Sequence, residues 1–269
     1  MMILRRFLVI LIVILTSCAS LPKHFAEVQT FKPLSFENVI NEIQNDRVIF
    51  VGEFHGDRKS HAVEFEVIKS LHEKGKEIVI GFEMFPHTSQ HELDGWVDGS
   101  TDKRKFLEIF QNHVNLPFYH YEKIFKYARE WGIPIVGINS DKTLIRNVSR
   151  NGIEAVPEKV LAELKFSGCS QNNEYTRMFA KKYHSNKMTF LCNGQRLRDT
   201  YMAYNIAKIL EHNDSTVVVI VGIAHAVKLA VPQILSQYTP LPYKVILPEG
   251  VKRIFERRLD TGIADYIWY

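Results

Sequence analysis

The sequence predicts an α/β fold, in which a mainly parallel β-sheet is flanked by helices and joined by a smaller all-helical subdomain. Short apolar runs rich in β-branched residues recur along the chain, and amphipathic stretches of helical length separate them. Such alternation is typical of parallel sheets covered on both faces. The interval 140–214 is far longer than one crossover between parallel strands needs, so we expect it to hold an insertion.

The expected strands and helices follow from length and periodicity. An apolar run of about four to eight residues is too short for a helix and indicates a buried strand. Such runs occupy 48–51, 78–81, 134–137, 217–221 and 243–247. Apolar residues recur at helical spacing between them. The expected helices lie within 61–72, 88–130, 157–164, 172–184 and 195–210.

The first residues are typical of a bacterial lipoprotein leader. Two arginines precede an apolar run over 7–15, and Thr16-Ser17-Cys18 follow it. This is the order of a signal peptide, and the run of about nine residues falls well short of the roughly 20 that span a bilayer. We therefore expect cleavage before Cys18 and lipid attached to its thiol, on the periplasmic side of a membrane. Ala19 after the cysteine favours the outer membrane.

These patterns give the expected domain boundaries. The leader covers 1–17, a lipid-anchored tether covers 18–34, and a single α/β domain covers 35–269 with a helical insertion at about 153–195. The segment 22–33 lacks clear periodicity, which is why the domain is expected to begin near Ser35.

Charge and cysteine content narrow the partners and the compartment. The formal net charge is +4, and the basic residues after the leader are interspersed with acidic ones. This is not the basic stripe of a nucleic-acid-binding protein, so no nucleic-acid partner is expected. Cys169 and Cys192 are the cysteines left after Cys18. An oxidising periplasm permits them to pair, but their spacing alone does not decide it.

Polar residues follow a glycine at the ends of four expected strands. The segments are Gly52-Glu53-Phe54-His55, Gly81-Phe82-Glu83, Gly137-Ile138-Asn139 and Gly222-Ile223-Ala224-His225. The carboxyl ends of parallel strands meet at one edge of a sheet, where ligands bind. The residues expected to converge on a crevice there are Glu53, His55, Glu83, Asn139 and His225.

Two histidines and two glutamates at such an edge allow three kinds of site. They could be metal ligands, an acid–base pair, or a polar cup for a charged ligand. Spacing does not choose among these. His55 and His61 are six residues apart, unlike the i, i+4 pair of a helical zinc site. His61 is expected to have a structural role at the start of the next helix, with Ser60 as the N-cap.

A second candidate site lies in the insertion. Tyr175, Met178, Phe179, Lys182 and Tyr183 share one helical face. A packed amphipathic helix is the ordinary interpretation. The alternative is a surface for a flat, apolar dianion such as haem, which uses aromatic contacts for its ring, cations for its carboxylates and a tyrosine for its iron.

Two further segments could contribute to a site beside the crevice. Tyr119 and Tyr121 are rival iron donors, because the helix that they precede leads into a parallel strand and so begins at the ligand-binding edge. In the last long helix, Gln195, Asp199 and Met202 share a face. The two polar side chains could reach the crevice while Met202 packs.

Together these residues resemble the ChaN family, bacterial iron-regulated lipoproteins associated with haem uptake. The matching segments cover nearly the whole mature chain in order. They are Gly52 to His55 with His61, Gly81 to Pro86, Gly137 to Asn139, Ser149 to Gly152, Gln195 to Ala203, Gly222 to His225 and Ala264 to Tyr266. The resemblance implies a parallel sheet with a helical subdomain, and haem bound at a homodimer interface as two stacked rings.

The resemblance also implies a tyrosine ligand to the haem iron from one subunit, with histidine and lysine from the other holding the propionates. Tyr175, Tyr183 and Tyr121 are the candidate iron ligands. His184 and Lys182 are the candidate propionate partners by charge and proximity. His55 and His225 complete the set of expected cofactor-binding residues.

The primary hypothesis is a membrane-tethered haem-binding protein without catalytic turnover, which acts in iron acquisition beside an outer-membrane haem receptor. The alternative is a lipid-anchored hydrolase, because the same framework resembles erythromycin esterases and metal-dependent proteases. His55 would then be the general base or a metal ligand, with Glu53, Glu83 and His225 as partners. A scaffold protein with a degenerate site is the third hypothesis.

Overall fold

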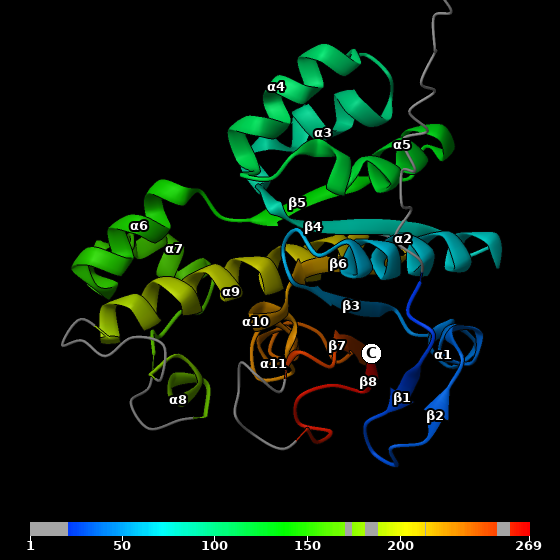
Figure 1. The fold of residues 1–269 in the computed structure, drawn as a ribbon. Coiled ribbons are helices and arrows are strands. Elements are labelled where there is room, and N and C mark those ends of the chain that lie inside the picture. Colours follow the sequence, from blue (N-terminus) through cyan, green and yellow to red (C-terminus); the bar gives the residue numbers. More distant parts are fainter. Residues whose placement is uncertain (1–20, 170–173, 181–187, 213, 252–258) are drawn as a thin grey trace, which may run out of the picture.

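The structure is a computed structural model that describes residues 21–169, 174–180, 188–212, 214–251 and 259–269. An eight-stranded sheet forms its centre, with helices on both faces (Figure 1). The strands are β1 Phe25–Glu27, β2 Pro33–Leu34, β3 Val48–Glu53, β4 Ile78–Pro86, β5 Ile135–Asn139, β6 Thr216–Gly222, β7 Tyr243–Pro248 and β8 Tyr266–Trp268. Their order across the sheet is β2-β1-β8-β7-β3-β6-β4-β5. The predicted α/β class is confirmed.

The five strands expected from the sequence are parallel to one another, and β8 also pairs parallel with β7. β3 lies between β6 and β7, with Val48 opposite Val217 on one side and Tyr243 on the other. β4 lies between β6 and β5. Because these strands are parallel, their polar carboxyl ends lie along one edge of the sheet.

Some of the helices begin at a residue whose side chain caps them. The helices are α1 Phe36–Ile43, α2 Arg58–Glu73, α3 Gln90–Val97, α4 Lys103–His113, α5 Glu122–Trp131, α6 Lys142–Asn151, α7 Glu158–Glu163, α8 Glu174–Ala180, α9 Met188–His212, α10 Ile223–Ala226 and α11 Val231–Leu235. Asp57, not the expected Ser60, is the N-cap of α2, and its carboxylate accepts the N–H of Ser60 at 2.9 Å. Within the described ranges no helix is both long and apolar enough to cross a bilayer.

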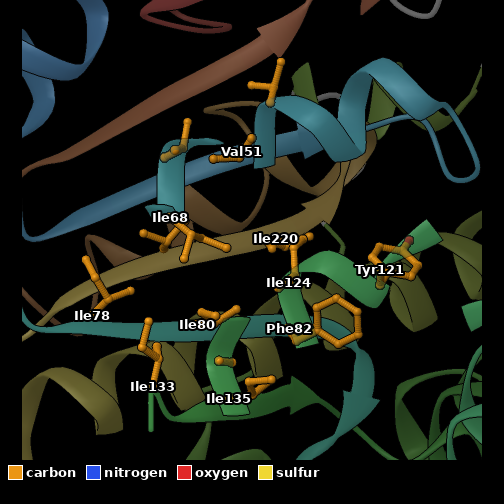
Figure 2. Close-up of a cluster of buried hydrophobic side chains, with 14 of the residues drawn as sticks. Val51, Ile68, Ile78, Ile80, Phe82, Tyr121, Ile124, Ile133, Ile135 and Ile220 are labelled. Atoms are coloured by element: carbon orange, nitrogen blue, oxygen red, sulfur yellow. The ribbon is translucent and has the colours of Figure 1, made fainter. Parts of the chain in front are cut away.

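The sheet separates two hydrophobic cores. Neighbouring residues of β3 alternate between them, with Ile49 in the core under α1 to α5 and Phe50 in the core under α9, α10 and α11. Figure 2 shows part of the first core, where Phe82 of β4 lies beside Ile124 of α5. Because the central strands are buried on both faces, their sequences are continuous apolar runs.

A small helical subdomain packs on the first part of α9. α6 and α7 lie beside this part of α9 in Figure 1. Val148 of α6, Leu164 after α7 and Leu197 of α9 belong to a third, separate core. Gly194 lets α6 and α9 approach closely, because a Cβ there would lie 1.9 Å from the Ser149 hydroxyl oxygen.

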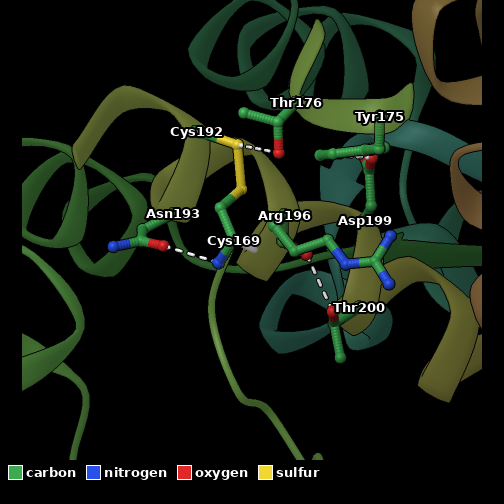
Figure 3. The surroundings of a disulfide bond; sticks show 8 residues. All are labelled: Cys169, Tyr175, Thr176, Cys192, Asn193, Arg196, Asp199 and Thr200. Carbon is green, nitrogen blue, oxygen red and sulfur yellow. Dashed lines mark hydrogen bonds between the residues drawn. A yellow bond between two sulfur atoms is a disulfide. The ribbon is translucent and has the colours of Figure 1, made fainter. Parts of the chain in front are cut away.

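A disulfide joins Cys169 and Cys192, whose Cα atoms are 6.0 Å apart (Figure 3). It ties the segment before α8 to the first part of α9. The N–H of Cys169 also donates to the side-chain oxygen of Asn193 at 2.8 Å. The pairing that spacing left open is therefore present in the fold.

The sheet begins earlier in the chain than expected. β1 pairs antiparallel with β8 and with β2, and Phe25 is completely buried. The expectation that 18–34 is a tether is therefore wrong for 25–34. These residues escape detection by periodicity because the two strands are too short to show an alternating pattern.

Candidate functional site

The side chain of Glu53 is the centre of a buried polar cluster at the end of β3. Its Oε1 is hydrogen-bonded to His55 Nδ1 and accepts the hydroxyl of Tyr121 at 2.6 Å. Its Oε2 lies 3.1 Å from His61 Nδ1, which also lies 3.0 Å from Glu64 Oε2. β3, the segment between β3 and α2, α2 itself and the start of α5 thus place five chemically active side chains together.

Glu83, at the end of β4, is the centre of a second cluster. Its Oε1 pairs with the guanidinium of Arg198 from α9 and lies 3.4 Å from His225 Nε2. Its Oε2 accepts the backbone N–H of Gly222 at the end of β6. Gly222 leaves little room beside it, because a Cβ there would lie 3.0 Å from His55 Nε2 and 3.4 Å from Glu83 Oε2. The two clusters therefore lie side by side around this glycine.

His225 is fixed from its other side by α9. Its Nδ1 is hydrogen-bonded to Asp199, and Asp199 accepts the hydroxyl of Tyr175 at 2.6 Å. The amide of Gln195 lies 3.0 Å from the same ring. Met202 is completely buried. Gln195 and Asp199 thus reach the ring of His225 while Met202 packs, but neither polar side chain lines the cavity at the strand ends.

The buried carboxylates shift the pKa values of their partners. Burial raises the pKa of Glu53, but hydrogen bonds from His55 and His61 outweigh burial and hold that pKa below its usual range. Burial lowers the pKa of His61, but hydrogen bonds to Glu53 and Glu64 raise it to about 10. Burial and the charge of Glu53 raise the pKa of Glu64 well above its usual value.

A cavity of about 550 Å³ opens beside the two clusters. Glu83 and Asn139, near the ends of β4 and β5, line this cavity, and so does Arg198 of α9. The amide of Asn139 donates to the backbone oxygen of Glu83 at 2.9 Å, so it positions this strand end. The complete lining is His55, Glu83, Met84, His113, Val114, Asn115, Leu116, Asn139, Ser140, Lys142, Ile145, Arg146 and Arg198.

The candidate tyrosines have separate surroundings. Tyr121 is completely buried, and burial and Glu53 together raise its pKa. Tyr175 is 3% exposed, and burial and Asp199 raise its pKa. Tyr119 is 58% exposed. Tyr183, like Lys182 and His184, lies outside the described residues.

Sequence reasoning did not include Glu64 or Arg198 in the site, and it gave His61 only a structural role. Glu64 lies on a helix among apolar residues and is fully buried, which its charge does not suggest. Its position three residues after His61 is the one signal that could have indicated the pair, because such residues share a helix face.

A model of the family described as haem-binding uptake, Tiki superfamily, ChaN matches residues 39–235. A chloroplastic protein of Arabidopsis thaliana, RETICULATA-RELATED 5, is 20% identical in an alignment 264 residues long that covers 87% of this chain. This chain spans only 35% of the length of that relative.

Among solved structures, the ChaN of Campylobacter jejuni, described with cofacial haem binding, has a TM-score of 0.68 at 20% identity and covers 91% of this chain and 95% of its own. An erythromycin esterase EreC mutant in its open conformation has a TM-score of 0.52 at 16% identity, covering 83% and 76%. The type III effector HopBA1 has a TM-score of 0.51 at 12% identity, covering 86% and 90%. At these identities the likeness shows a shared fold.

Proposed function

The chain belongs to the ChaN family of haem-binding uptake proteins in the Tiki superfamily, and from this premise we propose that it binds haem at the cavity beside the sheet edge. In this role it carries or stores haem for iron acquisition and turns over no substrate. When bound, the haem supplies an iron centre, while the protein supplies burial, counter-charges and an axial ligand.

The lining of the cavity is the observation that supports this proposal. Met84, Leu116 and Ile145 provide apolar walls. Lys142 and Arg146, which belong to α6, provide positive charge. Haem is a flat apolar ring with two carboxylates. Apolar walls can bury the ring while the cations pair with the carboxylates, so the residues present fit this ligand.

The proposed iron ligand is Tyr183, with Lys182 and His184 as propionate partners. A tyrosine binds ferric iron as the phenolate. Tyr121 and Tyr175 each donate the phenol hydrogen to a buried carboxylate, so either would have to break that bond to reach iron. Of the three candidate ligands that the family resemblance implies, Tyr183 is therefore the first to replace.

A haem titration of the leader-free protein tests the proposal. We expect saturable binding with a high-spin ferric spectrum and phenolate charge-transfer bands, and we expect Tyr183→Phe to lose those bands. Tyr121→Phe and Tyr175→Phe are matched controls that should retain them. A wild-type protein without saturable binding would contradict haem carriage. Bands that survive in Tyr183→Phe but vanish in a control would move the iron ligand to that tyrosine.

Homodimerisation is the proposed route to a fully enclosed haem. The Campylobacter jejuni ChaN is described with cofacial haem, and two stacked rings held by two facing copies would be shielded from water. Haem that binds only the dimer must raise dimer strength by mass action. Size-exclusion chromatography should therefore show more dimer with haem than without it. An unchanged dimer fraction would remove this part of the proposal.

Anchoring is proposed from the leader alone. Residues 1–20 lie outside the described part of the chain, so the lipidation of Cys18 is proposed from the sequence pattern of the leader. Lipid on Cys18 would place the protein on the outer membrane, where an outer-membrane haem receptor is the proposed partner. A Cys18→Ser variant should lose incorporation of labelled palmitate and move to the soluble envelope fraction. Unchanged membrane association would contradict lipid anchoring.

Hydrolysis is a second candidate function. Two histidines at the same edge are each held by a buried carboxylate, His55 by Glu53 and His225 by Asp199. The hydrogen bond to Glu53 raises the pKa of His55, against the effect of burial. Such pairs are typical of general bases. Ester hydrolysis that is lost in His55→Ala while haem still binds would support this function, and no activity over a panel of esters would count against it.

A further inference from the structure

We propose that Glu53, His61 and Glu64 bind one divalent transition-metal ion, Mn²⁺ or Zn²⁺, at a buried site separate from the haem cavity. One nitrogen of His61 and one oxygen from each carboxylate all lie within 4.8 Å of one another. All three side chains are buried, and Glu64 has no exposed surface. This cluster goes beyond the proposed function, because none of its three members lines the cavity.

Counting hydrogens shows that His61 cannot satisfy both carboxylates of the cluster. His61 Nδ1 lies 3.1 Å from Glu53 Oε2 and 3.0 Å from Glu64 Oε2, yet one ring nitrogen carries at most one hydrogen. Glu64 Oε1 is buried and has no hydrogen-bond partner among the described residues. A buried carboxylate in this position must take up a proton or bind a cation. Two carboxylates match the charge of a divalent ion.

The distances suit direct coordination. Metal bonds of about 2.1 Å to nitrogen and oxygen place neighbouring ligand atoms about 3.0 Å apart in an octahedron and about 3.4 Å apart in a tetrahedron. The two contacts of His61 Nδ1, at 3.0 and 3.1 Å, fall at the short end of this range. A metal ion could therefore enter with small side-chain movements. An imidazole and two carboxylates form a donor set that suits Mn²⁺ and Zn²⁺.

The surrounding structure already orients the ligands. Tyr121 and His55 both bind Glu53 Oε1, which leaves Oε2 facing His61. His61 and Glu64 are three residues apart in α2, so they share one face of a regular helix. Partners of this kind fix ligand geometry in metal sites. The donors thus come from the rigid end of a strand and the first turns of a helix.

Metal content and metal affinity test the proposal directly. The haem-free protein should be prepared without a histidine tag and with Cys18→Ser, so that neither the tag nor this thiol binds metal. After treatment with EDTA, it is titrated with Mn²⁺ or Zn²⁺ by calorimetry. After desalting, metal is counted by mass spectrometry. We expect one ion per chain and a higher Tm with metal. Glu64→Gln, which keeps the size of the side chain, should lower affinity by more than about tenfold.

A control and a second readout keep the outcomes distinct. Glu92 pairs with His113 at 2.9 Å, and the described residues provide no third ligand there. Glu92→Gln should therefore keep full metal binding. No stoichiometric ion and no metal-dependent rise in the wild-type Tm would overturn the proposal, and so would unchanged affinity in Glu64→Gln. The Tm of each metal-free variant shows whether it folds, and haem titration of the same samples fails separately if only the haem proposal is wrong.

Discussion

Glu83 is a carboxylate that is almost completely buried and stabilised by its neighbours. Burial raises its pKa, but electrostatic interactions with His225 and Arg198 outweigh burial, so its pKa lies below the usual value of 4.5. A carboxyl whose pKa is lower in the folded than in the unfolded protein stabilises the fold. This contribution is complete at pH values above the pKa of the unfolded protein, about 4.5. That stability is lost as the pH falls through the folded-state pKa.

Replacing Glu83 with glutamine should therefore destabilise the protein in a pH-dependent way. The variant leaves Arg198, whose side chain is 31% exposed, without its carboxylate. We expect the free energy of unfolding at pH 7 to fall by about 2 kcal/mol, after allowance for this exposure. The difference in the free energy of unfolding between variant and wild type should shrink below pH 4.5. Urea unfolding at pH 7 and at a pH below 4.5 measures this difference.

The control for this prediction is Glu211→Gln. Glu211 forms an exposed i, i+3 pair with Lys208, so its loss should leave stability unchanged within error. A Glu83→Gln defect of the same size at low and neutral pH would show that the cost comes from packing, not from charge.

At the residue scale, sequence predicts strand ends better than helix contacts. Glu53, His55, Glu83 and His225 could be placed at one edge, because parallel strands carry their ends to the same side. The contact between Tyr121 and Glu53 joins residues 68 positions apart. It depends on how α5 packs on the sheet, which local periodicity does not encode.

At the element scale, α6 and α9 approach each other because Gly194 has no side chain. A Cβ on Gly194 would lie 1.9 Å from Ser149 Oγ and 3.2 Å from the backbone oxygen of Ile145. α6 carries Lys142, Ile145 and Arg146 of the cavity wall, and α9 carries Arg198. The spacing of these helices therefore sets the width of the proposed haem site.

Gly194→Ala should destabilise the protein and weaken haem binding. Alanine favours a helix by about 1 kcal/mol over glycine, so helix propensity alone would give stabilisation. We expect overpacking to prevail and lower the free energy of unfolding by about 1–3 kcal/mol. Adding Ser149→Gly should restore much of the haem affinity by making room. Denaturant unfolding and haem titration test both steps, and a stabilised single variant would contradict the close approach.

The existence of the central elements could be predicted, but not all their limits. Strands 78–81 and 217–221 are found as Ile78–Pro86 and Thr216–Gly222. The helix expected at 195–210 begins at Met188 instead. The segment Met188–Gly194 includes Thr189, Asn193 and Gly194, which are poor helix formers. Packing on α6 and the disulfide at Cys192 hold it helical.

At the scale of the whole molecule, the first two strands complete one side of the sheet. A chain that begins at residue 35 should therefore be much less stable than one that begins at residue 21. It loses the buried side chains of Phe25 and Val28 and leaves β8 as an open edge. We expect a loss of about 4 kcal/mol or more, with aggregation. Thermal unfolding and size-exclusion chromatography compare the two chains, and equal Tm values would contradict this role.

The pairing of β1 with β8 also sets an order on folding. Phe25–Glu27 comes early in synthesis, yet one of its two neighbours in the sheet is Tyr266–Trp268. A chain made from its amino end therefore carries this apolar strand unpaired until residues near the carboxyl end exist, and such distant pairing forms slowly. A ribosome that stops just short of Tyr266 would release a chain with open edges at both β1 and β7. Quality control could thus detect a nearly complete product as readily as a short fragment.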